Sequence, residues 1–300
     1  MSMFGGRIGR RPEGADRSKS ARWVIALVIA LFGIFSYFNQ TEINPVTGEK
    51  QRIAMNVDQE KSLGLEAAPK MAQQMGGAVD PRSDPRARLV AEVGARLVNE
   101  SDARKSPYAD NFHFYLLNDE KTVNAFALPG GQIFITKALY SRLSNEAELA
   151  GVLGHEIGHV INRHGAQHMA KGQLGQILLV AVGVGASGED DGGRKAQMAA
   201  MLANQMIQMK YGRDDETESD TYGLRYMAQA GYDPRGMLEV MKVLKEAGNG
   251  AGPPEFLSTH PLPETRIQQI QATIETTYPN GIPRDLHKGG PLVGNRLSWR

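Results

Sequence analysis

The stretch Gly154-His155-Glu156-Ile157-Gly158-His159-Val160 contains the pattern H-E-x-x-H. Residues four apart on a helix lie on one face, one turn apart, so His155 and His159 can both reach one metal ion. Zinc accepts imidazole and carboxylate ligands in a tetrahedron, and a catalytic site keeps its fourth position for water. Glu156 would lie beside that water, where it can take a proton and pass it to a leaving amine. The pattern predicts a catalytic zinc site on a helix.

The residues around this pattern favour the same interpretation. The segment EAELAGVLGHEIGHVINRH, residues 146–164, is apolar along one side, as expected for a helix that packs against a core. Asn145 and Glu148 match a capping pair that begins a helix running to about His164. Each histidine alone would more often be a surface or hydrogen-bonded core residue, but a buried helix is the setting that a catalytic site needs.

A zinc ion needs a third protein ligand, and the acidic segment RDDETESD, residues 213–220, is the first candidate. Glu216 and Asp220 share a helix face, so one carboxylate can bind zinc while the other holds the far nitrogen of a ligand histidine. By spacing alone, such a run is more often the solvated start of a helix. The other histidines considered are His164, His168, His260 and His287, and we interpret His164 and His168 as structural or surface residues.

Composition limits the alternatives. The chain has 300 residues, enough for one large domain or two small ones, and its formal net charge is +1. This balance gives no support for a nucleic-acid-binding protein, which usually carries a basic face. Because there is no cysteine, any metal must be held by nitrogen and oxygen ligands.

Hydrophobic patterning predicts an α+β fold with a helical majority and a small β-sheet. Strands are expected over residues 111–118 and 131–136, and helices over 58–76, 84–101, 196–211, 214–230, 234–248 and 264–277. The apolar segment 174–187 is interpreted as a core helix, with a hydrophobic lid or membrane-dipping hairpin as the alternative.

The N-terminal region predicts a membrane anchor. Residues 1–22 are basic, and residues 23–38 form an uninterrupted apolar run, which predicts a single transmembrane helix over 23–39 that contacts the lipid bilayer. A cleaved signal peptide fits poorly, because no small-residue cleavage site follows the run. The positive flank would remain in the cytoplasm. Further divisions are a linker over 40–57, a metallopeptidase domain over 58–277 and a loosely ordered tail over 278–300.

The sequence resembles the gluzincin peptidases, and more narrowly the HtpX- and BepA-like zinc peptidases, which are relatives of the CAAX prenyl endopeptidase. Four stretches carry this resemblance: Asn124-Ala125 with Pro129-Gly130-Gly131, HEIGHVINRH over 155–164, YGRDDETESD over 211–220 and THPLPETRI over 259–267. The resemblance implies a zincin-type fold and one zinc ion per chain.

The same resemblance implies roles for individual residues. His155, His159 and Glu216 would bind zinc, Glu156 would be the general base and then the acid, and Asp220 would orient a ligand histidine. Arg213 would pair with acidic groups near the site. His260 would either stabilise the oxyanion or occupy the fourth position on the metal and switch the enzyme off. The edge strand that pairs with extended substrate is expected at Asn124, Ala125, Phe126, Ala127 and Leu128, with a plain hairpin equally open.

The predicted function is a zinc-dependent endopeptidase that hydrolyses protein or peptide substrates, with a role in envelope protein quality control implied by the resemblance and the anchor. The expected location is a bacterial inner membrane, with a cytoplasmic N-terminus and a periplasmic peptidase domain. A zinc-bound chaperone or assembly factor with little proteolysis, latched by His260, is the alternative. A structural zinc site is weaker, because such sites favour cysteine and would leave Glu156 without a role.

Overall fold

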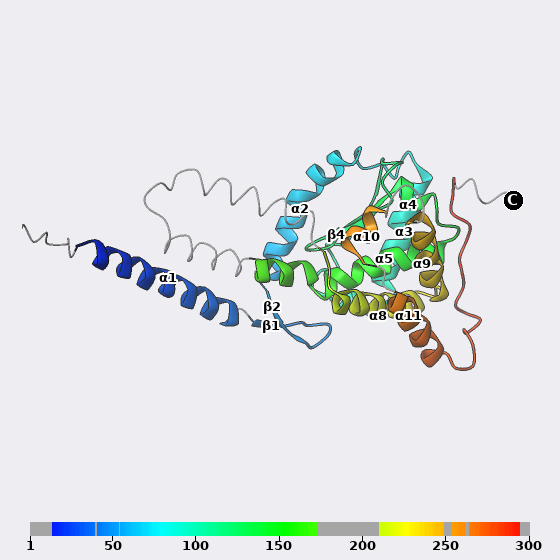
Figure 1. Cartoon of the computed structure of the whole chain (residues 1–300). Helices are drawn as coiled ribbons and strands as arrows, with labels where there is room; N and C mark the ends of the chain where they lie inside the picture. Colours follow the sequence, from blue (N-terminus) through cyan, green and yellow to red (C-terminus); the bar gives the residue numbers. More distant parts are fainter. Residues whose placement is uncertain are drawn as a thin grey trace, which may run out of the picture.

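A computed structural model describes residues 14–39, 41–53, 55–172, 210–248, 254–261 and 264–294 (Figure 1). Helices and strands alternate irregularly along this part of the chain. In order they are α1 (Gly14–Asn39), β1 (Thr41–Ile43), β2 (Lys50–Arg52), α2 (Val57–Gln74), α3 (Pro85–Asn99), the short 3-10 helix η1 (Asp102–Lys105), β3 (His113–Leu117), β4 (Ala125–Leu128), β5 (Gln132–Thr136), α4 (Lys137–Tyr140), α5 (Glu146–Ile161), α8 (Arg213–Gln229), α9 (Arg235–Gly248), α10 (Glu255–Thr259) and α11 (Glu264–Thr277).

The three-stranded sheet is small and buried. Its order is β3-β5-β4, with β3 parallel and β4 antiparallel to the central strand β5. Side chains alternate across β5, so Ile133 and Ile135 enter the main core with α3 and α5, while Phe134 packs toward Ala68 and Ala72 of α2. The sheet is thereby covered on both faces, and β4 forms one of its edges.

The α+β class with a helical majority and a small sheet is confirmed. Strands β3 and β5 fall within the segments predicted from the sequence, and α2, α3, α5, α8, α9 and α11 lie within about a residue of the predicted starts. The predicted segment 174–187, and 196–211 apart from its last two residues, lie outside the described residues.

Two segments differ from their expected character. The predicted linker contains the antiparallel hairpin β1–β2, which pairs Thr41 with Arg52. Residues 278–294, expected as a loose tail, run back to α5, where Glu146 N donates to Gly290 O and Ala147 N to Lys288 O. Each strand of the hairpin has only three residues, too few to show a periodicity, and polar contacts with α5 rather than a repeating pattern hold the last segment, which is why patterning missed both.

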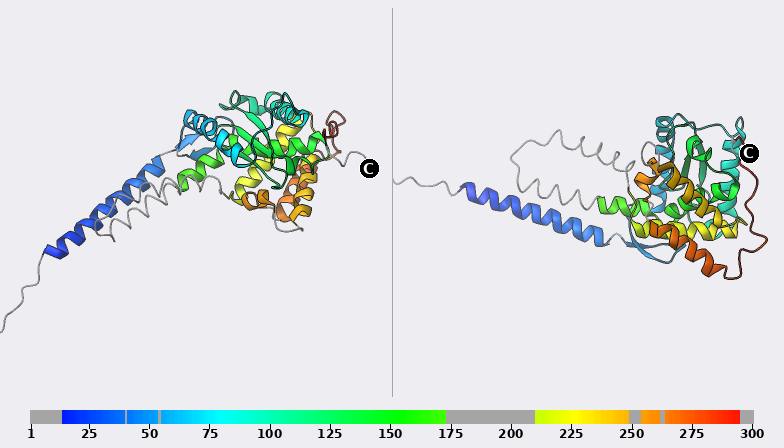
Figure 2. Two further views of the ribbon diagram at one scale, coloured as in Figure 1. Left: turned by 90° about the horizontal axis from the view of Figure 1, so that it is seen from above. Right: turned by 45° about the vertical axis from the view of Figure 1, so that its right-hand side comes forward.

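Helix α1 projects away from the body that contains the sheet, and the hairpin β1–β2 lies where the two meet (Figures 1 and 2). Within the part of the chain that the structure describes, no helix has the length and apolarity needed to cross a membrane.

Candidate metal centre

Helix α5 is buried over almost its whole length and fixed at both ends. At its start, the side chain of Asn145 accepts a hydrogen bond from Glu148 N, so the predicted cap is present. At its end, Asn44 Nδ2 of the hairpin donates to Ile161 O at 2.7 Å, and Gln51 Nε2 donates to the carbonyl of the next residue at 2.9 Å. These bonds satisfy carbonyls that the last helical turn leaves without partners.

The two histidines of the H-E-x-x-H pattern lie on one face of α5. Their Nε2 atoms are 3.1 Å apart, and both side chains are buried. Helix α8 packs closely against this face because small residues meet there: a Cβ added to Gly158 would lie 2.8 Å from Ser219 O. The approach brings Glu216 Oε1 to 3.4 Å from His159 Nε2 and Glu216 Oε2 to 3.6 Å from His155 Nε2.

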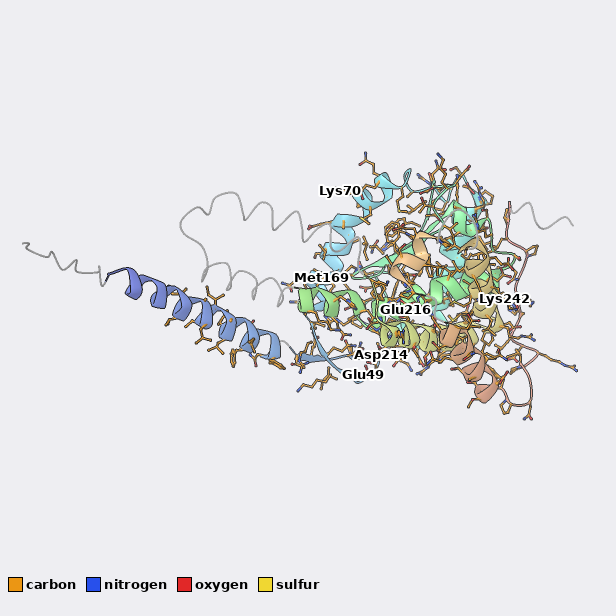
Figure 3. The ribbon with its side chains drawn as sticks, viewed as in Figure 1. Glu49, Lys70, Met169, Asp214, Glu216 and Lys242 are labelled. Carbon is orange, nitrogen blue, oxygen red and sulfur yellow. The ribbon has the colours of Figure 1, made fainter. Side chains whose placement is uncertain are left out.

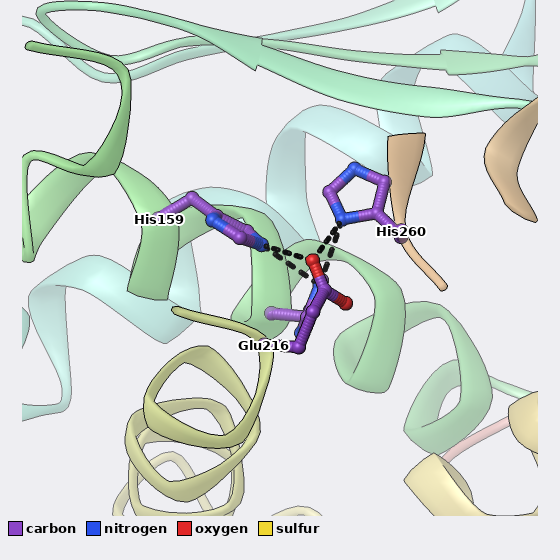
Figure 4. Close-up of side chains that lie close together, drawn as sticks. His159, Glu216 and His260 are labelled. Atoms are coloured by element: carbon purple, nitrogen blue, oxygen red, sulfur yellow. Dashed lines mark hydrogen bonds and ion pairs between the residues drawn. The ribbon is translucent and has the colours of Figure 1, made fainter. Parts of the chain in front are cut away.

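His260 joins this cluster from the segment that follows α10. Its Nδ1 lies 2.9 Å from Glu216 Oε1 and 3.3 Å from His155 Nε2. Figure 4 shows His159, Glu216 and His260 pointing toward one another from three separate elements. One ligand atom from each of the four residues lies within 4.8 Å of all the others. His155 and His260, which are 105 residues apart in the sequence, therefore meet in this cluster. The sequence predicted this meeting only through the family resemblance.

Asp220 and Arg266 each contact residues of the cluster through side-chain hydrogen bonds or ion pairs. Asp220 Oδ1 lies 2.9 Å from His155 Nδ1, which is the position expected for a residue that orients a ligand histidine. Arg266 of α11 donates to Asp220 through Nε at 2.5 Å and Nη2 at 2.8 Å, and its Nη1 pairs with Glu216 Oε2 at 2.5 Å. Burial opposes ionisation of Asp220, but Arg266 outweighs it and lowers the pKa of Asp220.

Arg213, the arginine singled out from the sequence, is not brought to the cluster. It is exposed at the first turn of α8 and makes no ion pair with the residues that the structure describes. In Figure 3, its neighbour Asp214 lies toward the edge of the body, while Glu216 lies inside it. The buried arginine of the site is Arg266. The only sequence signal for it was its place within the family-like stretch 259–267.

Glu156 is a buried carboxylate that has no hydrogen-bond partner among the described residues. It is 1% exposed. His260 Nε2 is 3.7 Å from Glu156 Oε1, and burial raises the pKa of Glu156. An unsatisfied buried carboxylate costs free energy, so its presence beside four potential ligands indicates a role in chemistry rather than in stability.

The protonation states of His159 and Glu216 match a divalent metal. Burial lowers the pKa of His159 well below its usual range, which leaves the ring neutral, as a ligand must be. Burial acts against ionisation of Glu216, but His260, His159 and Arg266 together hold the pKa of Glu216 well below its usual range. A neutral imidazole and an ionised carboxylate are donors that zinc prefers, so His159 and Glu216 fit that ion.

The predicted substrate edge borders the cluster. Strand β4 shares a groove with His260, Tyr211 and the α2 residues Met71 and Met75. Thr136 N donates to Asn124 O, so alternation along the antiparallel pair turns the backbone groups of Ala125 and Ala127 away from β5. The remaining predicted residues of the edge, Asn124, Phe126 and Leu128, are also on β4 or directly before it, and all three line the groove.

The site has the composition of an H-E-x-x-H metallopeptidase. It combines two histidines from one helix, a carboxylate from a second helix and a buried glutamate without a hydrogen-bond partner among the described residues. Residues 85–274 match peptidase family M48, and the chain belongs to this family. The resemblance stated from the sequence is confirmed.

Two relatives whose names describe proteases match most of the chain. The chain is 30% identical over 244 residues to the beta-barrel assembly-enhancing protease of Escherichia coli, covering 77% of this chain and 47% of that protein. It is 28% identical over 258 residues to the mitochondrial metalloendopeptidase OMA1 of Schizosaccharomyces pombe, covering 85% of this chain and 72% of the relative. The chain therefore spans about half the length of the bacterial relative.

Proposed function

We propose that the protein is a zinc-dependent endopeptidase that hydrolyses peptide bonds in protein substrates. The observation that carries this proposal is the buried Glu156 carboxylate, which has no hydrogen-bond partner among the described residues and lies beside the convergent donors His155, His159 and Glu216. Membership of family M48 supports the same reaction class. One zinc ion per chain would be held by the two Nε2 atoms and the Glu216 carboxylate.

Each residue of the chain then has a defined task. A bound zinc ion supplies Lewis acidity, which polarises a carbonyl and acidifies a water molecule. Glu156 receives the proton of the attacking water on a carboxylate oxygen and delivers it to the nitrogen of the leaving amine. Asp220 holds His155 through Nδ1. The outward backbone groups of Ala125 and Ala127 would pair with an extended substrate strand.

His260 supports a second candidate function, a zinc-bound chaperone or assembly factor with little proteolysis. Its Nδ1 is 2.9 Å from Glu216 Oε1, and it lies within the group that can hold a metal. In that position His260 can complete the ligand set and exclude water, which latches the site. Its other candidate role, stabilisation of the oxyanion, requires that the ring move off the ligand carboxylate when substrate binds.

We further propose that α1, which alone does not meet the length and apolarity of a spanning helix, anchors the protein by inserting its exposed apolar side chains into a membrane, and that the substrates are misassembled envelope proteins of a bacterium. The apolar side chains of α1 point outward in the structure: Phe32 is 70% exposed, Phe35 67% and Val28 59%. Exposed apolar surface on this scale needs a cover, and lipid at the inner membrane would provide one, with the peptidase body on the periplasmic side. Loss of the gene should then raise the level of misassembled envelope proteins, and an unchanged envelope proteome would contradict this role.

The test of the peptidase activity uses the full chain in detergent with casein as an unfolded substrate. Zinc-loaded wild type should release peptides, while chelator-treated protein and Glu156→Gln should not, and Glu156→Gln should still contain zinc. Wild-type protein that binds zinc but does not cleave would exclude an open protease. His260→Ala then separates the two functions, because new cleavage shows a latch and continued inactivity favours the chaperone.

A further inference from the structure

His164 lies on the side of His159 that faces away from the metal cluster. It is buried, with 1% of its surface exposed. Its Nδ1 is 2.9 Å from His159 Nδ1, and its Nε2 is 3.0 Å from Glu218 Oε2. The sequence favoured a structural or surface role for this residue. A buried ring that touches a metal ligand on one side and a carboxylate on the other calls for a more specific one.

The backbone before His164 is shaped to bring it to this place. On a continuous helix, residues five apart face different directions, so His164 could not reach back to His159. Arg163 breaks the helix with φ of 58°, the one positive value outside glycine among the described residues. Its guanidinium holds that conformation through Glu60 Oε1 at 3.2 Å, Glu42 Oε2 at 2.9 Å and Met55 O at 2.8 Å.

Only one placement of the ring protons fits the contacts that run from His159 through His164 to Glu218. His159 presents Nε2 to the cluster, so a neutral ring carries its proton on Nδ1. That N–H donates to His164, whose Nδ1 must therefore be the acceptor. A neutral His164 then carries its own proton on Nε2, where it donates to the Glu218 carboxylate. Ser219 Oγ, at 3.3 Å from His164 Nδ1, is the more distant competitor for the same nitrogen.

We propose that His164, backed by Glu218, is a positioning residue that fixes the tautomer and orientation of His159 for metal binding. This inference rests on the proposed zinc site. It gives each ligand histidine of α5 its own outer partner: Asp220 accepts from His155 Nδ1, and His164 accepts from His159 Nδ1. Outer partners of this kind change metal affinity by about 10–100-fold when they are removed.

Two substitutions at one position separate this role from simple packing. His164→Asn places an amide oxygen near the former Nδ1 and keeps the acceptor for His159, but loses the bond to Glu218. His164→Gln reaches the former Nε2 and keeps the bond to Glu218, but loses the acceptor. Zinc affinity of the full chain, measured by competition with a chelating dye, should fall about 10–100-fold in His164→Gln and much less in His164→Asn.

His168→Gln is the matched control, because His168 lies one turn further along, bonds Asp215 at 2.8 Å and makes no hydrogen bond to a metal ligand. Its zinc affinity should equal that of wild type. Equal affinities for the two His164 variants, or weaker binding by His164→Asn, would overturn the proposal. Failure of wild type to bind zinc would instead refute the proposed function, and this inference with it.

A second measurement covers the case in which a variant does not fold. Nitrogen-15 NMR of zinc-loaded wild type should show a proton on Nδ1 of His159 and on Nε2 of His164. A proton on His164 Nδ1 would contradict the inference directly.

Discussion

Replacing Arg266 with Met removes the charge that two buried carboxylates share while keeping a side chain of similar length. Arg266 is 2% exposed, and its guanidinium lies 2.5 Å from Asp220 Oδ2 and 2.5 Å from Glu216 Oε2. Removal of one member of a buried ion pair costs about 3–5 kcal/mol, because the remaining charge is left in a poor solvent. We expect Arg266→Met to lower the free energy of unfolding of the metal-free chain by that amount at neutral pH.

The destabilisation should depend on pH in a defined direction. The folded pKa of Asp220 is lowered from its ordinary 3.8, because Arg266 outweighs the opposing effect of burial. A carboxylate whose pKa is lower in the folded chain than in the unfolded chain stabilises the fold at pH values above its ordinary pKa. This stabilisation is lost as the pH falls through the folded pKa. Without Arg266, burial alone acts on Asp220 and favours its neutral form. The difference between wild type and variant should therefore be largest near neutral pH and shrink below about pH 4.

Urea unfolding of both proteins in excess chelator, at several pH values, measures this difference. Arg213→Met is the matched control, since Arg213 is an exposed arginine near Glu216 on α8. It should change the free energy of unfolding by less than about 0.5 kcal/mol. A loss below about 1 kcal/mol for Arg266→Met, or equal losses for the two arginines, would show that the buried charges are compensated in another way.

Three further perturbations test separate parts of the structure. Glu156→Gln should lower the cleavage rate by about 10²–10⁴ with unchanged zinc content, and retained cleavage would exclude Glu156 as the base. Gly158→Ala should cost about 1–3 kcal/mol of unfolding free energy and weaken zinc binding, because its Cβ would press on Ser219 O at 2.8 Å. Gly165→Ala, which meets only a side-chain carbon at 3.6 Å, should do neither. Arg86 lowers the pKa of Asp84 to about 2, so the stability that Asp84 contributes is lost as pH falls from about 4 to about 2. Asp84→Asn should therefore make the free energy of unfolding fall less steeply over this pH range. An unchanged slope, measured in chelator, would contradict this expectation.

The parts of the site that local spacing determines were accessible from the sequence. His155 and His159 are one turn apart on a helix, so their convergence follows from helical geometry alone. Arg266 and His164 were not accessible in this way. Arg266 reaches His155 across 111 residues, and its position depends on how α11 packs against α8. His164 depends on a backbone turn at Arg163 that ion pairs from distant segments maintain.

The hairpin β1–β2 is a second case in which contacts between distant segments could not be predicted from the sequence. Its sequence has the turn residues of a linker, but its side chains serve the end of α5. Asn44 bonds Ile161 O across 117 residues, and Glu42 bonds Arg163 across 121. Because Arg163 directly precedes His164, the segment that follows α1 is connected to a candidate metal ligand through only two intervening side chains.

The close approach of α5 and α8 links the stability of the fold to the chemistry of the site. A Cβ on Gly223 would lie 3.0 Å from His155 N, and one on Gly154 would lie 3.3 Å from Gly223 O, so larger residues would separate the helices. The two histidines come from α5 and Glu216 from α8, and the distance between these helices therefore sets the size of the ligand cluster. A metal that binds all three residues favours the packed arrangement over the separated one, and its binding free energy becomes folding free energy at this interface. The small residues of α5 and α8 are thus needed for metal affinity as well as for packing, because the same backbone separation governs both.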